Sequence, residues 1–240
     1  MRDLGRVIAH IPARAGSKRV RAKNLRILCG KPLLAYSVEC AKQCSEFDEI
    51  YVNTDSIEMA ALASELGVKT YLRPSELASD TATGDEFTVD FIEKIKPNTL
   101  VMINPVCPLV TPSDVSAAIN AFKASDSDTL ITCDATQMQT FCNGEAVNIS
   151  LDGQLAPTQE NPEIQTLNWA VTVWDANRFL EHFYNTGSAY IGKKRTLFAI
   201  DPIKGLKISH EADFQMAECL IYGLSQQQKQ ANTVEYWTEK

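Results

Sequence analysis

A loop rich in cations and small residues lies near the start of the chain, directly after the apolar run Val7-Ile8-Ala9. The protein carries a net charge of −7, yet ten residues of this loop hold Arg14, Lys18, Arg19, Arg21 and Lys23. Four small residues keep its backbone amides accessible: Ala13, Ala15, Gly16 and Ser17. Amides and cations after a first strand suit the phosphates of a nucleotide. Charge alone leaves a solvated cationic surface as the alternative.

Two motifs give this loop a family context. Residues 11–24 read I-P-A-R-A-G-S-K-R-V-R-A-K-N, and residues 72–83 read L-R-P-S-E-L-A-S-D-T-A-T. In both stretches the chain resembles the acylneuraminate cytidylyltransferases, the CMP-sialic acid synthetase family, whose first loop looks like I-P-A-R-x-G-S-K-x-x-x-x-K-N. The resemblance continues through G-K-P-L at 30–33 and V-N-T-D at 52–55. It implies an enzyme that couples CTP to a nonulosonic or related sugar acid and releases pyrophosphate.

The resemblance also assigns roles to residues of the first loop. Arg14 and Lys23 are the expected catalytic residues, which hold the triphosphate and stabilise its charge, with Lys23 near the α-phosphate. The full expected set of nucleotide contacts adds Ala13, Ala15, Gly16, Ser17, Lys18, Asn24, Thr83 and Asn104 to these two. Structural alternatives exist for two of them, because Thr83 also suits a helix cap and Asn24 a turn or helix start.

The acceptor half departs from the family's pattern in three places. Asn104 stands where the family has a glutamine, so the amide is kept on a shorter side chain. The family's Arg before Asn-Gly-Ala is missing, since residues 166–170 read T-L-N-W-A. Lys207 and Ser209 stand where the family has a metal-binding Asp-x-Asp pair. The expected acceptor contacts are Asn104, Asn168 and Lys207.

Lys207 carries the most specific hypothesis about the chemistry. Two carboxylates would recruit a hard cation that bridges phosphates and a sugar carboxylate, whereas a lysine repels that cation. We therefore expect no protein-held metal; Mg²⁺ would arrive with the nucleotide, with help from Glu211, or Lys207 would replace one metal charge. Two alternatives remain: a nucleotide-binding paralogue without transferase activity, and a nucleotidyltransferase with a different acidic or phosphorylated acceptor.

Alternating strand and helix patterns predict an α/β fold with a doubly wound, mostly parallel Rossmann-like sheet. The expected strands are 7–11, 49–53, 69–72, 100–104, 129–133 and 169–174, and the expected helices are 33–44, 56–66, 85–95, 113–122 and 211–224. Ligands bind at the carboxyl ends of such strands, where Arg14, Asp55 and Asn104 fall. Asp55 suits either a ribose contact or a helix cap, and we favour a structural salt bridge for Arg73.

Residues 135–190 differ from the rest, with turn signals at 143–144, 152–153 and 161–162. By resemblance they form a small β-rich dimerisation lobe, inserted in a single cytidylyltransferase domain that spans residues 1–240. The protein is then expected to be a homodimer whose partner helps to close the active site.

Composition narrows the remaining function classes. The net charge of −7 disfavours nucleic-acid binding, and no apolar run approaches the roughly 20 residues of a membrane helix. The N-terminus lacks the apolar core of a signal peptide. Seven scattered cysteines without a C-x-x-C pair suit reduced thiols, so we expect a cytoplasmic protein. Cys107 suits either a reactive thiol or, preferably, a small packing residue.

Overall fold

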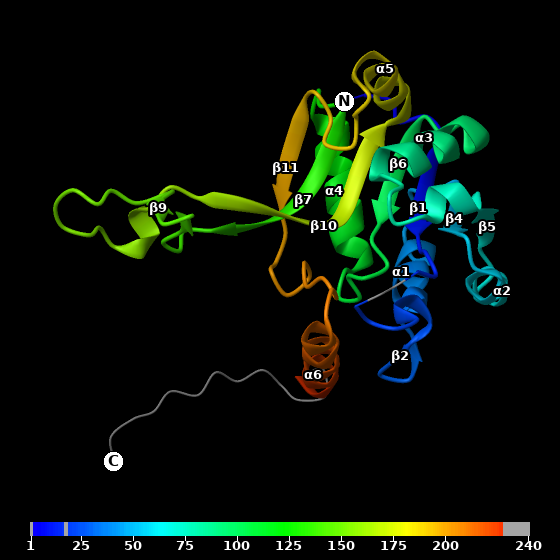
Figure 1. The fold of residues 1–240 in the computed structure, drawn as a ribbon, viewed down its shortest axis with the longest axis horizontal. Helices are drawn as coiled ribbons and strands as arrows, with labels where there is room; N and C mark the ends of the chain where they lie inside the picture. Colours follow the sequence, from blue (N-terminus) through cyan, green and yellow to red (C-terminus); the bar gives the residue numbers. More distant parts are fainter. Residues whose placement is uncertain (1, 17–18, 228–240) are drawn as a thin grey trace.

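The computed structural model describes residues 2–16 and 19–227, and a seven-stranded sheet forms its centre (Figure 1). The spatial order is β11 (Arg195–Ala199), β7 (Thr129–Thr136), β10 (Ile164–Asp175), β6 (Thr99–Ile103), β1 (Val7–Pro12), β4 (Glu49–Thr54) and β5 (Lys69–Leu72). These strands run parallel except β10, which pairs antiparallel with both β6 and β7. The mostly parallel Rossmann-like sheet predicted from the sequence is confirmed.

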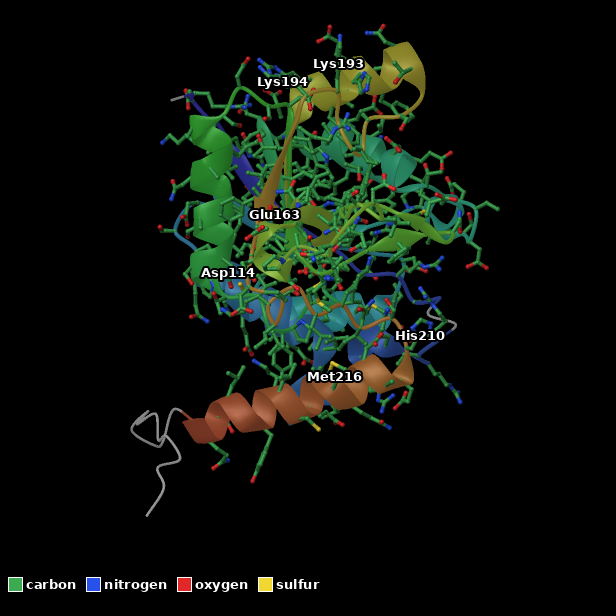
Figure 2. The ribbon with its side chains drawn as sticks, turned by 90° about the vertical axis from the view of Figure 1, so that its left-hand side faces the viewer. Asp114, Glu163, Lys193, Lys194, His210 and Met216 are labelled. Carbon is green, nitrogen blue, oxygen red and sulfur yellow. The ribbon has the colours of Figure 1, made fainter. Side chains whose placement is uncertain are left out.

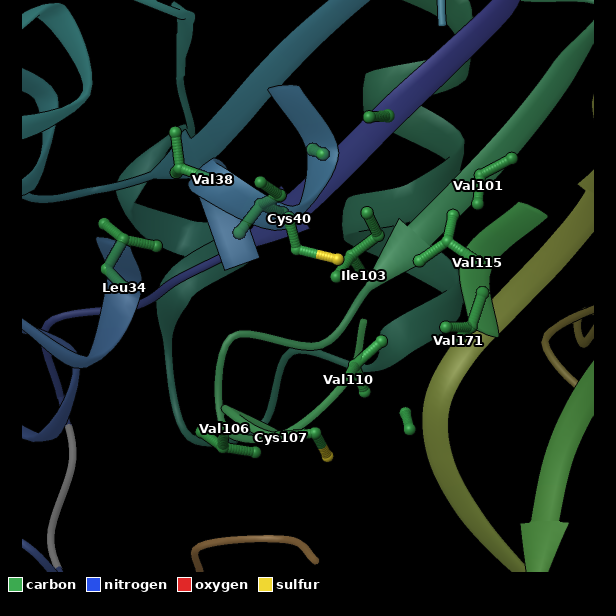
Figure 3. Packing of buried hydrophobic residues seen from close by; sticks show 14 of the residues in the cluster. Leu34, Val38, Cys40, Val101, Ile103, Val106, Cys107, Val110, Val115 and Val171 are labelled. Carbon is green, nitrogen blue, oxygen red and sulfur yellow. The ribbon is translucent and has the colours of Figure 1, made fainter. Parts of the chain in front are cut away.

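Helices cover both faces of this sheet. One face packs against α1 (Leu33–Lys42), α2 (Ile57–Glu65), α4 (Pro112–Ala124) and part of α6 (Glu211–Gln227), and Figure 3 shows part of that core. The other face packs against α3 (Gly84–Ile95) and α5 (Ala176–Thr186). Buried side chains of β1 alternate between the two cores, as a strand's two-residue period requires. No helix within the described residues is both long and apolar enough to cross a membrane.

Three features of this architecture differ from the sequence-based expectation. The helix expected from Ser113 begins at Pro112, and its cap is Thr111, whose side chain accepts from the amide of Asp114. Proline suits the first helical position because its missing N–H would have no partner there. The strand expected at 169–174 extends over the whole of β10. Neither α5 nor the edge strand β11 was predicted.

A thin arm leaves the body between β7 and β10 (Figure 1). Its hairpin pairs β8 (Phe141–Cys142) with β9 (Glu145–Ala146) around Asn143 and Gly144, whose φ angles are +52° and +87°. Two positive φ angles are typical of tight hairpin turns. The segment that projects is narrower than the lobe expected over 135–190, because β10 and α5 rejoin the body. Large apolar side chains stay exposed along the arm: Met138, Phe141, Val147, Leu151 and Leu155.

Short elements connect the first strand with α1. A single turn of 3₁₀ helix, η1 (Lys23–Leu25), follows the cationic loop, and β2 (Ile27–Leu28) pairs with β3 (Lys31–Pro32) in a small hairpin. Two further 3₁₀ turns are η2 (Ser75–Ala78) and η3 (Thr158–Glu160). The order of elements therefore brings η1, with Lys23 and Asn24, back to the end of β1.

Candidate nucleotide and acceptor site

Three adjoining pockets open at the carboxyl ends of the central strands, and Arg14 lines all three. The loop pocket measures 390 Å³ and includes Arg19, Lys23, Asn24 and Asn104 in its lining. The aromatic pocket measures 490 Å³ and is lined by Pro12, Arg14, Arg73, Phe87, Met102, Asn104, Trp169, Tyr190 and Lys207. The outer pocket measures 520 Å³ and is lined by residues 14–16, 21–22 and 78–80. The site therefore lies where ligands bind in parallel α/β sheets.

The backbone of the first loop is tied to the end of β4. The amide of Ala13 donates to the carbonyl of Asn53 at 2.9 Å, and the amide of Ala15 donates to Oδ1 of Asp55 at 2.9 Å. Asp55 thus holds the loop, whereas the side chain of Ser56 caps α2. The expected helix cap at Asp55 is therefore wrong, because Ser56 takes that role, and the expected ribose contact stays a prediction. Gly16 and Ala15 line the outer pocket, while the expected contacts Ser17 and Lys18 lie outside the described residues.

Asn24 supports the same loop from η1. Its side chain is 4% exposed and lines the loop pocket. Its Nδ2 donates to the carbonyl of Arg14 at 3.4 Å, whereas its buried Oδ1 has no hydrogen-bond partner among the described residues. A buried acceptor without a partner costs free energy unless a ligand or water donates to it. Asn24 is therefore placed both to fix Arg14 and to accept a hydrogen bond from a ligand.

The cations of the site crowd one another. Lys23 is half-buried, and its Nζ donates to the carbonyl of Ile208 at 2.8 Å. Burial lowers the pKa of Lys23, and the charges of Arg19 and Lys207 lower it further. Arg14 lies 3.2 Å from a carboxylate oxygen of Asp80. Because like charges repel in a partly desolvated site, an anion bound among Arg19, Lys23 and Lys207 would relieve that repulsion.

Arg73 lines the aromatic pocket without the salt bridge expected from the sequence. The side chain is buried, and its guanidinium donates to Oδ1 and the carbonyl of Asn53 at 2.9 and 3.1 Å. It also lies 4.3 Å from the ring centroid of Phe87. No carboxylate of the described residues lies within ion-pair distance of it. Burial lowers the pKa of Arg73 to about 10, so the group remains charged at neutral pH.

The three expected acceptor contacts have different positions. Lys207 lines the aromatic pocket, and Asn104 lines both the aromatic and the loop pocket. Asn168 lines none of the three pockets and is 6% exposed. Its Nδ2 donates to Asp134 at 2.9 Å, and its Oδ1 accepts from Thr132 at 2.7 Å. Sequence reasoning missed four pocket residues, Phe87, Met102, Trp169 and Tyr190, because apolar side chains carry no motif of their own.

The residues of this site do not fit a metal ion held by the protein. The amides of Ser209 and His210 both donate to Oδ2 of Asp213 at 2.8 Å, and Glu211 pairs with Arg26 at 2.6 Å. Within residues 2–16 and 19–227, no three His, Cys, Asp or Glu side chains gather as potential metal ligands. Hard cations such as Mg²⁺ need several oxygen ligands. A magnesium ion carried by the nucleotide stays a prediction, whereas Glu211 is committed to Arg26.

Cys107 packs below the site in the loop after β6 (Figure 3). It is 1% exposed, and burial raises the pKa of its thiol to about 12, although the charges of Lys207 and Lys23 act in the opposite direction. A thiol that stays protonated is a poor nucleophile. Of the two expectations for Cys107, the structure favours the packing residue.

His10 extends the polar contacts of Arg73 into the core. Its Nε2 lies 3.0 Å from Nδ2 of Asn53, and its ring stacks on Phe91 with centroids 4.4 Å apart. Asn53 already accepts from Arg73 through Oδ1, so its Nδ2 donates to His10. That donation requires a neutral imidazole whose proton sits on Nδ1. His10 is therefore a core histidine.

We expect His10 to make the protein less stable in acid. Complete burial, followed by the charge of Arg73, lowers its pKa to about 3. The unfolded chain takes up this proton near pH 6.5, whereas the folded protein does not. The free energy of unfolding should therefore fall between about pH 6.5 and pH 3, by up to about 1.4 kcal/mol per pH unit.

Denaturant unfolding near pH 7 and pH 5 measures this effect. The free energy of unfolding should fall by about 2 kcal/mol more in the parent protein than in the His10→Gln variant over that interval. His182→Gln, on α5, is the matched control for removal of a histidine. Equal losses in parent and His10→Gln would show that His10 does not contribute.

Thr83 is the N-cap of α3, one of the two alternatives left open by the sequence. Its Oγ1 accepts from the amide of Glu86 at 3.2 Å, and Glu86 accepts from the amide of Thr83 at 2.7 Å. Thr83→Ala should therefore lower the free energy of unfolding by about 1 kcal/mol, whereas Thr83→Ser keeps the cap. KM for CTP should change less than about threefold, because Thr83 lines none of the three pockets. A large rise in KM with unchanged stability would assign Thr83 to nucleotide binding instead.

Comparisons with known proteins agree with this geometry. A family model described as cytidylyltransferase matches residues 8–236. A CMP-N,N′-diacetyllegionaminic acid synthase of Legionella pneumophila is 30% identical over 198 residues, 75% of this chain and 83% of that protein. An N-acylneuraminate cytidylyltransferase of Escherichia coli is 49% identical over 82 residues, 34% of this chain and 20% of that protein. The structure of a CMP:2-keto-3-deoxy-manno-octonic acid synthetase complexed with CTP has the same fold, with a TM-score of 0.68 at 16% identity, covering 91% of this chain and 99% of that one.

Proposed function

Because this chain belongs to the cytidylyltransferase family, we propose that it transfers the cytidylyl group of CTP to a nonulosonic, sialic-acid-like sugar acid. A hydroxyl group of the acid loses its proton to water as its oxygen attacks the α-phosphorus. The bond from that phosphorus to the oxygen that bridges to the β-phosphorus breaks, and pyrophosphate leaves with that oxygen. The observation that carries this proposal is the junction of the pockets at Arg14, with cations on one side and a cationic, aromatic cavity on the other. The names of the relatives support the substrate class.

Phosphoryl and nucleotidyl transfer depend mainly on positioning and on charge stabilisation. Arg14 and Lys23 hold the triphosphate, and Lys23 faces the negative charge that develops as pyrophosphate leaves. The carbonyl of Ile208 fixes the ammonium group of Lys23, and Asn24 fixes the backbone at Arg14. Mg²⁺ carried by the phosphates of CTP would add positive charge to the leaving pyrophosphate. The chain's own residues then orient the two reactants.

The assembly proposed here is a homodimer formed through the arm. Five large apolar side chains of residues 138–155 are exposed on a segment that has no core of its own. Such exposure favours burial against another protein surface. We place the enzyme in the cytoplasm because none of the seven cysteines forms a disulfide in the structure.

Pyrophosphate release from CTP tests the proposal. The acids to be compared, with Mg²⁺ present, are N,N′-diacetyllegionaminic acid, N-acetylneuraminic acid and 2-keto-3-deoxy-manno-octonic acid. Release that requires one of these acids supports the transferase. Tight CTP binding without release by any acid would support the alternative, a nucleotide-binding paralogue, which the lysine at position 207 and the absence of a carboxylate cluster among the described residues favour.

A further inference from the structure

Trp169 has a backbone conformation that glycine normally adopts. Its φ is +60°, inside the left-handed region where a large side chain is crowded by its own backbone. It lies in β10 where the register with β7 shifts between Leu167 and Thr172. Such bulges turn side chains toward functional sites, and a strained residue persists only where its surroundings hold it. The conformation of Trp169 therefore calls for a reason beyond packing.

Side chains from β10 and from the residue that follows β6 hold this bulge in place. Nδ2 of Asn104 donates to the carbonyl of Trp169 at 3.1 Å. Oδ1 of Asn168 accepts from the amide of Ala170 at 3.1 Å, while its Nδ2 reaches Asp134. Both asparagines thus hold the peptide group that joins Trp169 to Ala170.

The segment that carries Lys207 lies against the same support. A Cβ atom on Gly205 would fall 2.5 Å from Nδ2 of Asn168, which shows how closely the backbone at Gly205 approaches that side chain. Gly205 is buried, and Lys207 follows two residues later on the lining of the aromatic pocket. The asparagine that supports Trp169 therefore also packs against the segment that leads to Lys207.

The aromatic pocket consequently has two chemically different linings. The ring of Trp169 lies 5.3 Å from that of Tyr190, which lies 6.5 Å from that of Phe87. These rings and Met102 form its apolar lining. Its positive charge comes from Arg14, Arg73 and Lys207. A cavity of 490 Å³ with these linings suits a small acid that also carries an apolar group.

We propose that Trp169 is a specificity-determining residue for the acceptor, an inference that rests on the proposed function. The indole presents a fixed surface on which the methyl group of an N-acyl substituent packs, while the carboxylate of the same acid faces the cations. An acid without an acyl group leaves that surface without an apolar partner. Trp169 therefore selects N-acylated sugar acids over simpler ones.

Acceptor selectivity in three proteins tests this assignment: the parent, Trp169→Gly and Trp169→Phe. The parent should favour N,N′-diacetyllegionaminic or N-acetylneuraminic acid over 2-keto-3-deoxy-manno-octonic acid by about tenfold or more in kcat/KM. Trp169→Gly should reduce this ratio to below about threefold, with KM for CTP nearly unchanged. Trp169→Phe keeps an aromatic surface and should keep most of the ratio. Glycine suits a φ of +60°, so the Gly variant should fold.

Two outcomes separate this inference from the proposed function. If the parent turns over and Trp169→Gly has the same ratio of kcat/KM between N-acylated and simpler acids, the inference is overturned and the proposed function stands. If no acid supports turnover, the function fails, and tryptophan fluorescence decides the inference. Acid added to the CTP complex should quench the tryptophan fluorescence of the parent but not that of Trp169→Phe. This variant keeps the other two of the three tryptophans. Absence of quenching in the parent by all three acids would then overturn the inference.

Discussion

Replacing Lys23 with methionine should lower kcat by about 100- to 1,000-fold while the protein stays folded. The ammonium group lies among Arg19 and Lys207, its pKa is lowered mainly by burial, and the carbonyl of Ile208 holds it in place. A charge fixed in a partly desolvated site stabilises a developing anion without further reorganisation. Methionine keeps the length of the side chain and removes the charge.

Single-turnover and steady-state assays of CTP consumption measure this effect. Lys94→Met, on the exposed side of α3, is the matched control and should keep kcat within about twofold. A near-normal kcat in Lys23→Met would show that Lys23 does not stabilise the transition state. It would leave Arg14 and the loop amides as the groups that act on the phosphates.

Reversing the charge of Lys207 should lower kcat/KM for the acid about 100-fold, with a much smaller change in KM for CTP. Lys207 lines the aromatic pocket with Arg14 and Arg73, where a carboxylate of the acceptor needs positive charge. Lys207→Glu replaces that attraction by repulsion. Lys207→Arg keeps the charge and should retain most of the activity.

Steady-state kinetics with both substrates varied separate the two effects. Lys193→Glu is the matched charge-reversed control, because Lys193 lies beside α5 at the opposite end of the molecule from His210 (Figure 2). A change in KM for CTP alone would place Lys207 at the triphosphate. Normal kinetics of Lys207→Glu with both substrates would show that Lys207 contacts neither of them.

The place of the cationic loop could be predicted from the sequence. Small residues and cations that follow a buried strand lie at the end of that strand, and the family resemblance singled out Arg14, Lys23 and Asn24, which all line the loop pocket. Their contacts with a nucleotide stay a prediction. Thr83 could be read two ways because a threonine before a helix serves equally as a cap or as a contact. The hydrogen bond with Glu86 shows the cap, and the nucleotide contact stays a prediction.

The acceptor half could not be predicted in the same way. The strand around Trp169 was expected, but its antiparallel direction was not. Side chains alternate in the same way in parallel and antiparallel strands, so the sequence pattern does not reveal the direction of β10. The φ angle of Trp169 and the bulge around it depend on tertiary contacts from Asn104 and Asn168. Asn168 was expected to touch the acceptor and instead supports the residue that does so in our proposal.

Arg73 shows a further limit of reasoning from motifs. Its charge, in a loop rich in helix-capping residues, favoured a structural salt bridge over catalysis. The structure places Asn53 and Phe87 beside it instead. The partner of a buried charge is set by strands that are distant in sequence, so a motif identifies the residue and leaves its partner undetermined.

The most direct test of this account follows the α-phosphorus of CTP. With CTP labelled at that atom and an N-acylated nonulosonic acid present, we predict that the label moves into a product containing both CMP and the acid, in equal amount to the pyrophosphate released. Label found only in CTP, or released as free CMP whether or not the acid is present, would contradict transfer to a sugar acid.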